Sequence, residues 1–175
     1  TKGSAGKSRW LHPLYRERWP LYVERITKTL APVVRIYAPQ NEANGDMALG
    51  YISATWPPGL LLDFGKHAAA MRQSVWGFRK AAEIIRENRK DALILSITAQ
   101  PYWYWGLWDP TRAYYNFMQR LNLTYLDRTY DLCDLIGFNY YYSEYADFGA
   151  LVALKARRGD SLLGHVLALP GVVPE

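Results

Sequence analysis

The stretch QNEANG, residues 40–45, places a glutamate between amides directly after the short apolar run 33–38. Glutamate is one of the side chains that proteins use for proton transfer, so Glu42 is a candidate general acid or base. A second polar group, Asn139-Tyr140-Tyr141, belongs to another apolar run, residues 134–141. The alternative for both groups is structural: a loop glutamate without a chemical role, and packing at the end of a strand. The choice depends on whether the fold brings the two groups together.

Three apolar runs predict buried strands, and three stretches with helical spacing predict helices. The run ALILSITA is nearly continuous, which is typical of a strand buried on both faces of a parallel sheet. Asp63 is a candidate cap for the second helix, and Asp109-Pro110 is a typical start for the third. The predicted strands are 33–38, 92–99 and 134–141, and the predicted helices are 14–30, with a kink possible at Pro20, 65–90 and 109–127. Residues 40–63 are predicted to be a long irregular loop, of a kind that is usually functional.

The alternation of helices and strands predicts an α/β fold with a parallel sheet and right-handed crossovers. Long loops with polar groups at the carboxyl ends of strands favour a (β/α)8 TIM barrel over a doubly wound sheet. No GxGxxG or GxxxxGK[ST] pattern follows a strand, which argues against nucleotide binding. We expect a single domain over residues 1–175 that forms a partial barrel, with about three parallel strands and flanking helices on one face. Glu42, Gln100 and Asn139 should lie at the same end of that sheet.

Composition and charge exclude several other classes of protein. Half of the 175 residues are hydrophobic and 15% are aromatic, which indicates a folded globular domain. The net charge is +5, but the basic residues form no one-sided stripe, because they alternate with acidic residues along the helices. This distribution argues against the alternative of a nucleic-acid-binding protein whose aromatic stretch WYWGLW stacks on bases. The single Cys133 excludes an internal disulfide and a cysteine-based zinc site, and no cluster has metal-ligand spacing. His67 is expected to be a capping or core histidine.

The sequence contains no apolar run long enough to span a membrane and no charged-then-apolar leader. Together with the single cysteine, this favours a cytoplasmic protein that does not contact a membrane. The oligomeric state cannot be deduced from these patterns.

Four stretches together resemble glycoside hydrolase family 1, the β-glucosidase and β-glycosidase family. The stretch GKSRWLHPLYRERWPLYVERITKTLAPVVRIYAPQNEANG is similar to the part of that family that ends in its strand-four Asn-Glu-Pro motif. LGYISATWPPG is similar to the loop behind that motif, HAAAMRQSVWGFRKAAEII to a helix that begins with histidine, and CDLIGFNYYYSEY to the sixth strand. The resemblance covers roughly residues 7–145 and implies strands four to six of an eight-stranded barrel.

The resemblance implies hydrolysis of a β-linked glucoside or galactoside with retention of configuration, which needs two carboxyl groups. It assigns Glu42 as the acid that protonates the leaving oxygen and then as the base that activates water. Asn41 would bind the sugar 2-hydroxyl, Tyr141 would hydrogen-bond the nucleophile, and Asn139 would lie on the same rim of the substrate site. The implied partner is a β-linked glycoside or oligosaccharide, and this chemistry requires no metal or other cofactor.

Two departures from the family pattern leave a second function open. Ala43 stands where the motif has proline, and the Glu-Asn-Gly motif that carries the family's nucleophile does not occur in the chain. The chain also begins at Thr1 and stops at Glu175 without a clear final element, which favours a fragment of a longer protein. We expect this chain to carry the acid/base half of the site and to show no turnover alone. The alternative is a non-catalytic carbohydrate-binding or scaffold protein derived from the same barrel.

Overall fold

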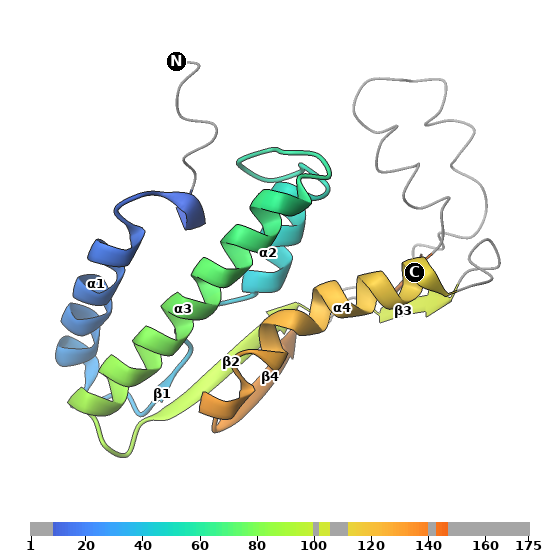
Figure 1. Ribbon diagram of the computed structural model, residues 1–175. Coiled ribbons are helices and arrows are strands. Elements are labelled where there is room, and N and C mark those ends of the chain that lie inside the picture. The colour runs from blue at the N-terminus through green and yellow to red at the C-terminus, as the bar shows by residue number, and fades with distance from the viewer. Residues whose placement is uncertain (1–8, 100–101, 106–111, 140–142, 147–175) are drawn as a thin grey trace.

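The computed structural model describes residues 9–99, 102–105, 112–139 and 143–146. Within them, β1, β2 and β4 form a parallel sheet with β2 in the centre, and β3 and β5 form a separate parallel pair. Figure 1 shows α3 lying along this sheet, with α1 and α2 on either side of it. The elements in order are η1 (Arg9–Leu11), α1 (Tyr15–Leu30), β1 (Ile36–Tyr37), α2 (Ala43–Tyr51), α3 (Phe64–Asn88), β2 (Leu93–Ala99), β3 (Tyr102–Trp105), α4 (Ala113–Asp127), η2 (Tyr130–Leu132), β4 (Leu135–Asn139) and β5 (Ser143–Ala146).

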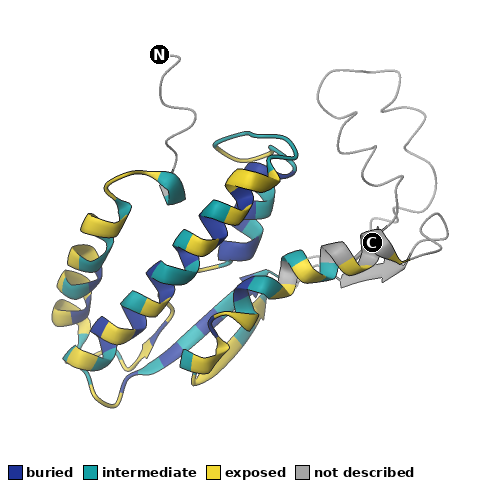
Figure 2. Cartoon of the chain, viewed as in Figure 1, coloured by how far each residue is buried: buried dark blue, intermediate teal, exposed yellow. Residues whose placement is uncertain are grey.

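The helices cover one face of the sheet, and the burial of β2 shows which one. Ile94, Ser96 and Thr98 are buried, whereas the residues that alternate with them are half-buried. Figure 2 shows this alternation along β2 and the buried side of α3 that faces it. The prediction of three adjacent parallel strands with helices on one face is therefore confirmed. Three strands do not close a barrel, so the barrel itself stays a prediction.

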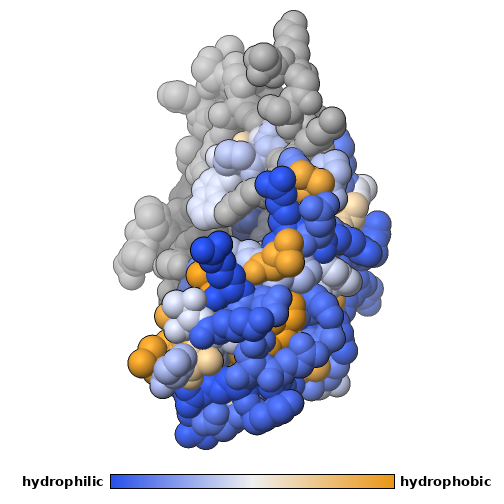
Figure 3. Space-filling model, turned by 90° about the vertical axis from the view of Figure 1, so that its left-hand side faces the viewer, coloured by the Kyte–Doolittle hydropathy of each residue, from blue (hydrophilic) through white to orange (hydrophobic). Residues whose placement is uncertain are grey.

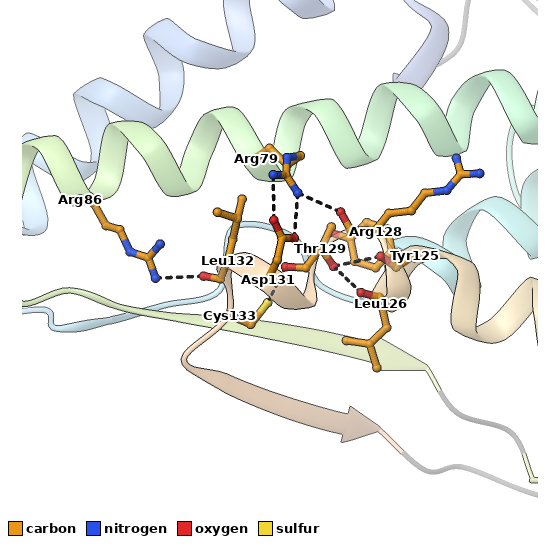
Figure 4. A network of polar contacts seen from close by, with 9 residues as sticks. All are labelled: Arg79, Arg86, Tyr125, Leu126, Arg128, Thr129, Asp131, Leu132 and Cys133. Carbon is orange, nitrogen blue, oxygen red and sulfur yellow. Dashed lines mark hydrogen bonds and ion pairs between the residues drawn. The ribbon is translucent and has the colours of Figure 1, made fainter.

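Polar contacts with α3 anchor the chain where it turns from α4 into β4 (Figure 4). Arg79 makes a bidentate ion pair with Asp131, with N–O distances of 2.8 and 2.9 Å. Further along α3, Arg86 contacts the carboxylate of Asp134 at 2.9 Å. Asp134 also accepts the Ile94 N–H at 2.8 Å, and this bond, supported by Arg86, lowers the pKa of its carboxyl group. These contacts fix the register in which β4 begins beside β2.

The predicted irregular loop 40–63 is wrong, because residues 43–51 form α2. Ala43, Met47 and Tyr51 recur at four-residue steps and are buried, as in a helix that packs on its neighbours. The helix buries polar residues as well, and it contains two glycines. It therefore lacks the amphipathic stripe by which a helix is recognised from sequence.

Other predicted boundaries are also corrected by local backbone geometry. The third helix begins at Ala113 and not at residue 109, because Arg112 has a φ of 55°, a left-handed conformation that a right-handed helix cannot contain. Asp109 and Pro110, the predicted start of this helix, lie outside the described residues. The first strand is limited to residues 36–37, since the N–H groups of Val33 and Val34 still bond to the Leu30 carbonyl.

Four further outcomes concern the bounds, continuity, capping and pairing of the elements. The strand predicted over 134–141 is observed as Leu135–Asn139. The helix predicted over 14–30 continues through Pro20, and Asp63 caps α3 by accepting the Lys66 N–H, as predicted. The pairing of β3 with β5 was not predicted, because no strand was assigned to residues 102–105 or 143–146 from the sequence.

The outer surface on the α1 side is mainly hydrophilic, with separate hydrophobic residues between the charged ones (Figure 3). Exposed hydrophobic residues of α1 include Leu21, Tyr22 and Ile26, and an exposed ion pair joins Lys28 to Glu24 in the same helix. This mixture is typical of a solvated helix face, as the alternating charges predicted. None of the described helices is both long and apolar enough to cross a membrane.

Helices α1 and α3 come into close contact at Gly77. The Trp19 indole N–H donates to the Gly77 carbonyl oxygen at 2.8 Å. A Cβ atom at position 77 would lie 2.2 Å from the Tyr15 hydroxyl oxygen and 3.0 Å from Gln40 Nε2. The absence of a side chain at this position therefore makes room for the Tyr15 hydroxyl and the Gln40 amide.

The Gly77→Ala variant should be less stable than the wild type by about 1–3 kcal/mol, because Tyr15 and Gln40 must move to admit the methyl group. Gly65→Ala in the same helix is the matched control. Its added Cβ atom would lie 3.7 Å from the nearest atom, Asp63 Oδ1, which is an ordinary contact. Alanine is the better helix former, so Gly65→Ala should leave stability unchanged or raise it by up to about 1 kcal/mol. Urea unfolding measures both, and equal losses in the two variants would contradict the steric argument.

Candidate active site

Glu42 lies where the chain leaves the sheet and enters α2. Its backbone N–H donates to the Ile97 carbonyl at 3.0 Å, and its own carbonyl accepts the first helical hydrogen bond, from the Asp46 N–H at 2.9 Å. Its φ of 49° lies in the left-handed region, which residues other than glycine rarely adopt. Such a conformation costs about 1–3 kcal/mol and is found preferentially at functional sites. Glu42 thus has a strained backbone at the edge of the sheet where parallel α/β folds bind ligands.

Asn139 meets Glu42 at this edge, although 97 residues separate them in the sequence. It is the last residue of β4 and lies opposite Ala99, the last residue of β2. Asn139 Nδ2 donates to Glu42 Oε1 at 2.5 Å. The prediction that Glu42 and Asn139 lie at the same end of the sheet is confirmed, and the contact orients the Glu42 carboxyl group.

The other predicted site residues are placed less completely. Asn41 forms a parallel bridge with Ile97, so it lies at the same edge, and its side chain is exposed. Tyr141 and Gln100 lie outside the described residues, and their predicted positions stay predictions. The structure thus brings together Asn41, Glu42 and Asn139.

Two residues of α2 that the sequence analysis did not identify hold this corner of the site. Asn44 Nδ2 donates to the Ala99 carbonyl at 2.7 Å, and Asn44 Oδ1 accepts the Ala99 N–H at 3.0 Å. The side chain thereby imitates a neighbouring strand and ties the first turn of α2 to the end of β2. Asp46 accepts the Trp10 indole N–H at 2.7 Å. The sequence shows polar residues within one turn after Glu42, which could have marked them as candidate site residues, but it does not indicate which residues they contact.

Solved structures that share this arrangement of helices and strands are glycosidases. The β-glucosidase of Pyrococcus furiosus matches 79% of this chain at 20% identity and a TM-score of 0.68, with 30% of that chain covered. The β-glycosidase of Thermosphaera aggregans matches 79% at 20% identity and a TM-score of 0.63, with 32% covered. The family 1 β-glucosidase of Thermotoga maritima, in complex with isofagomine lactam, matches 78% at 17% identity and a TM-score of 0.64, with 38% covered. The chain therefore shares its fold with a segment of each of these glycosidases.

These likenesses support the expected α/β fold with a parallel sheet, whereas the closed barrel stays a prediction. The chain spans about a third of the length of the structures that it matches. No protein-family model matches the chain, and no curated protein matches it. The assignment of the strands to positions four to six of the barrel stays a prediction. Both the function and the roles of the site residues therefore depend on the geometry at the sheet edge.

The geometry at the sheet edge suits proton transfer. Glu42 presents a half-buried carboxyl group with one oxygen held by an amide donor, and an exposed amide, Asn41, precedes it. A carboxyl group fixed in this way can donate a proton to a bound molecule or accept one from water. In the part of the chain that the structure describes, no group of three His, Cys, Asp or Glu residues could hold a metal ion.

His67 lies in the first turn of α3 and belongs to the protein core, as expected. Its side chain is buried, its Nε2 atom has no hydrogen-bond partner, and burial lowers the pKa of the imidazole. In the unfolded chain a histidine titrates near a pKa of about 6.5. Below that pH the unfolded state binds more protons than the folded state, so stability is fully present above it and is lost as the pH falls.

Replacing His67 by leucine should therefore flatten the pH dependence of stability on the acid side. The melting temperature of the wild type should fall between about pH 7.5 and pH 5.5, and that of His67→Leu should fall less. The exposed His12 provides the control, because His12→Leu removes a histidine without changing the protein core. Thermal melts at both pH values measure the effect, and parallel curves for wild type and His67→Leu would contradict it.

Proposed function

We propose that this chain carries the acid/base half of a retaining β-glycosidase site, with Glu42 as the acid/base. The contact between Glu42 and Asn139 at the carboxyl end of a parallel sheet, in a fold shared with β-glucosidases, supports the proposal most directly. The proposed substrate is a β-linked glycoside or oligosaccharide. Asn41 would bind the sugar 2-hydroxyl, and Tyr141 would orient the nucleophilic carboxylate.

The proposed reaction has two steps. In the first, Glu42 gives its proton to the glycosidic oxygen while a second carboxylate attacks the anomeric carbon, and the protonated leaving group departs. In the second, Glu42 takes a proton from water, the water oxygen bonds to the anomeric carbon, and the nucleophile is released. Asn139 holds one carboxyl oxygen of Glu42, which limits the rotamers of the side chain and orients the carboxyl group before the substrate binds.

The proposal assigns no nucleophile to this chain, because the sequence contains no Glu-Asn-Gly motif. We therefore expect no turnover from the 175 residues alone. Activity is to be tested in a chimera in which residues 9–146 replace the matching segment of a β-glucosidase. Comparing Glu42→Gln with the unaltered chimera on substrates with good and poor leaving groups tests the proposal. A sugar-binding protein without catalysis would bind glycosides in both forms and hydrolyse neither.

A further inference from the structure

Gln40, two residues before Glu42, is a buried amide whose hydrogen-bonding groups are all used. Only 6% of the residue is exposed. Its Nε2 atom donates to the Ser74 carbonyl at 3.1 Å and to the Tyr15 hydroxyl at 3.3 Å. Its Oε1 atom accepts from the Ser74 hydroxyl at 2.7 Å and from the Tyr125 hydroxyl at 2.8 Å. Two donors and two acceptor positions are the full capacity of a glutamine side chain.

The partners of Gln40 come from three different helices. Tyr15 belongs to α1, Ser74 to α3 and Tyr125 to α4, and Tyr125 is fully buried. Burial raises the pKa of both tyrosine hydroxyls well above the ordinary value, so each hydroxyl stays neutral at any physiological pH. The network thus fixes Gln40 from the helical layer without any charge that could titrate.

This network bears on the site because it ties the segment 38–42 to the helical layer. The regular pairing of β1 with β2 ends at Tyr37, and the next contacts with β2 are the Asn41 bridge and the Glu42 N–H bond, both to Ile97. Gln40 lies between these two regions and directs its side chain into the helical layer. A buried amide tolerates only the arrangement that satisfies it, because each lost hydrogen bond leaves a desolvated polar atom. A methionine would fill a similar space, but it makes no such hydrogen bonds and would not fix the orientation of the side chain at position 40.

We propose that Gln40 is a positioning residue that fixes the strand end carrying Asn41 and Glu42, so that the Glu42 carboxyl group stays in reach of Asn139 and of the substrate. This inference rests on the proposed function of Glu42. The hydrogen bonds of Gln40 act through the backbone, and Gln40 itself does not touch the substrate. Its loss should therefore impair proton transfer by Glu42 more than it impairs binding.

The structural test follows the Glu42 amide in the 175-residue chain, by hydrogen exchange and mass spectrometry at a concentration where the chain is monomeric. In Gln40→Met the Glu42 N–H, which bonds to Ile97, should exchange about tenfold faster than in the wild type. Ile85→Ala is the control for general destabilisation, because Ile85 is buried near the end of α3 where the chain turns back toward the start of β2. It should lower the melting temperature without a selective effect at Glu42. Equal acceleration in both variants would overturn the proposal.

The functional test uses the chimera and the ratio of rates on substrates with good and poor leaving groups. Gln40→Met should lower kcat on the poor-leaving-group substrate about tenfold or more, with a small change of KM and a smaller loss on the activated substrate. Tyr125→Phe removes one of the two bonds to Gln40 Oε1 and keeps its shape, so an intermediate effect is expected even where Gln40→Met fails to fold. If Gln40→Met and Tyr125→Phe both gave the same ratio of rates on the two substrates as Ile85→Ala, the positioning role would be overturned. If Glu42→Gln also left the ratio unchanged, the proposed function would fall as well.

Discussion

Glu42→Gln in the chimera should reduce hydrolysis of a glycoside with a poor leaving group far more than hydrolysis of an activated aryl glycoside. A sugar or alkyl leaving group needs a proton in the transition state, and general acid catalysis is typically worth about 10²–10⁴-fold. An activated phenol departs without that proton, so the first step on this substrate should survive in part. The measurement is kcat/KM for both substrates in both proteins, and the quantity that tests the idea is the ratio of the two losses.

Azide separates the two steps in which Glu42 is proposed to act. The variant lacks the base that activates water, so the glycosyl-enzyme should accumulate on the activated substrate. Azide is an anion that needs no general base, so adding it should restore turnover and yield the glycosyl azide. Glu83→Gln is the matched control, because Glu83 lies on α3 in an exposed ion pair with Lys80 and should affect neither substrate. Equal losses on both substrates, without rescue by azide, would show that Glu42 is not the acid/base.

The parts of the fold that the sequence predicted correctly depend on local signals. The continuous apolar run of β2, the apolar stripe of α3 and the Asp63 cap are each recognisable within a few residues. The meeting of Glu42 with Asn139 followed from one further rule, that parallel strands place their carboxyl ends at the same edge. Two polar groups that follow separate strands of such a sheet must then be close in space, whatever their separation in the chain.

The parts that the sequence did not predict depend on partners far away in the chain. Gln40 bonds to residues 25, 34 and 85 positions away, and no pattern around it indicates which ones. The side chain of Asn44 binds the backbone of Ala99, and no sequence pattern indicates this contact either. Helix α2 is buried on most sides and shows no stripe. These contacts require the packed structure.

The support of Glu42 explains how a strained backbone can persist at this position. The helical layer holds Gln40, β2 holds Asn44 and the Glu42 N–H, and β4 holds the carboxyl group through Asn139. Each contact is made by Glu42 itself or by a residue two positions away from it, so relaxation of its φ angle would disturb several hydrogen bonds at once. Strain that the surroundings impose in this way is a means of orienting a reactive group before the substrate arrives.

The 175-residue chain should self-associate, and the residues of β4 should be responsible. Phe138 is 59% exposed, although its neighbour in the register, Thr98, is fully buried beneath the helices. Ile136 and Leu135 are exposed as well, and in the described part of the chain no strand pairs with the outer edge of β4. An open edge with exposed apolar side chains is a template for pairing with another chain. Light scattering after size-exclusion chromatography should therefore show a mass that rises with concentration.

Phe138→Lys should shift this equilibrium strongly toward the monomer, because a lysine on an edge strand opposes pairing by charge and by the cost of burying it. Leu21→Lys is the matched control. Leu21 is 62% exposed, comparable to Phe138, but it belongs to α1 and not to the sheet edge. If exposed apolar surface of any kind caused the association, both variants would reduce it equally. A selective effect of Phe138→Lys would locate the contact at the sheet edge. A wild-type chain that stays monomeric at all concentrations would contradict the prediction that the exposed edge of β4 causes self-association.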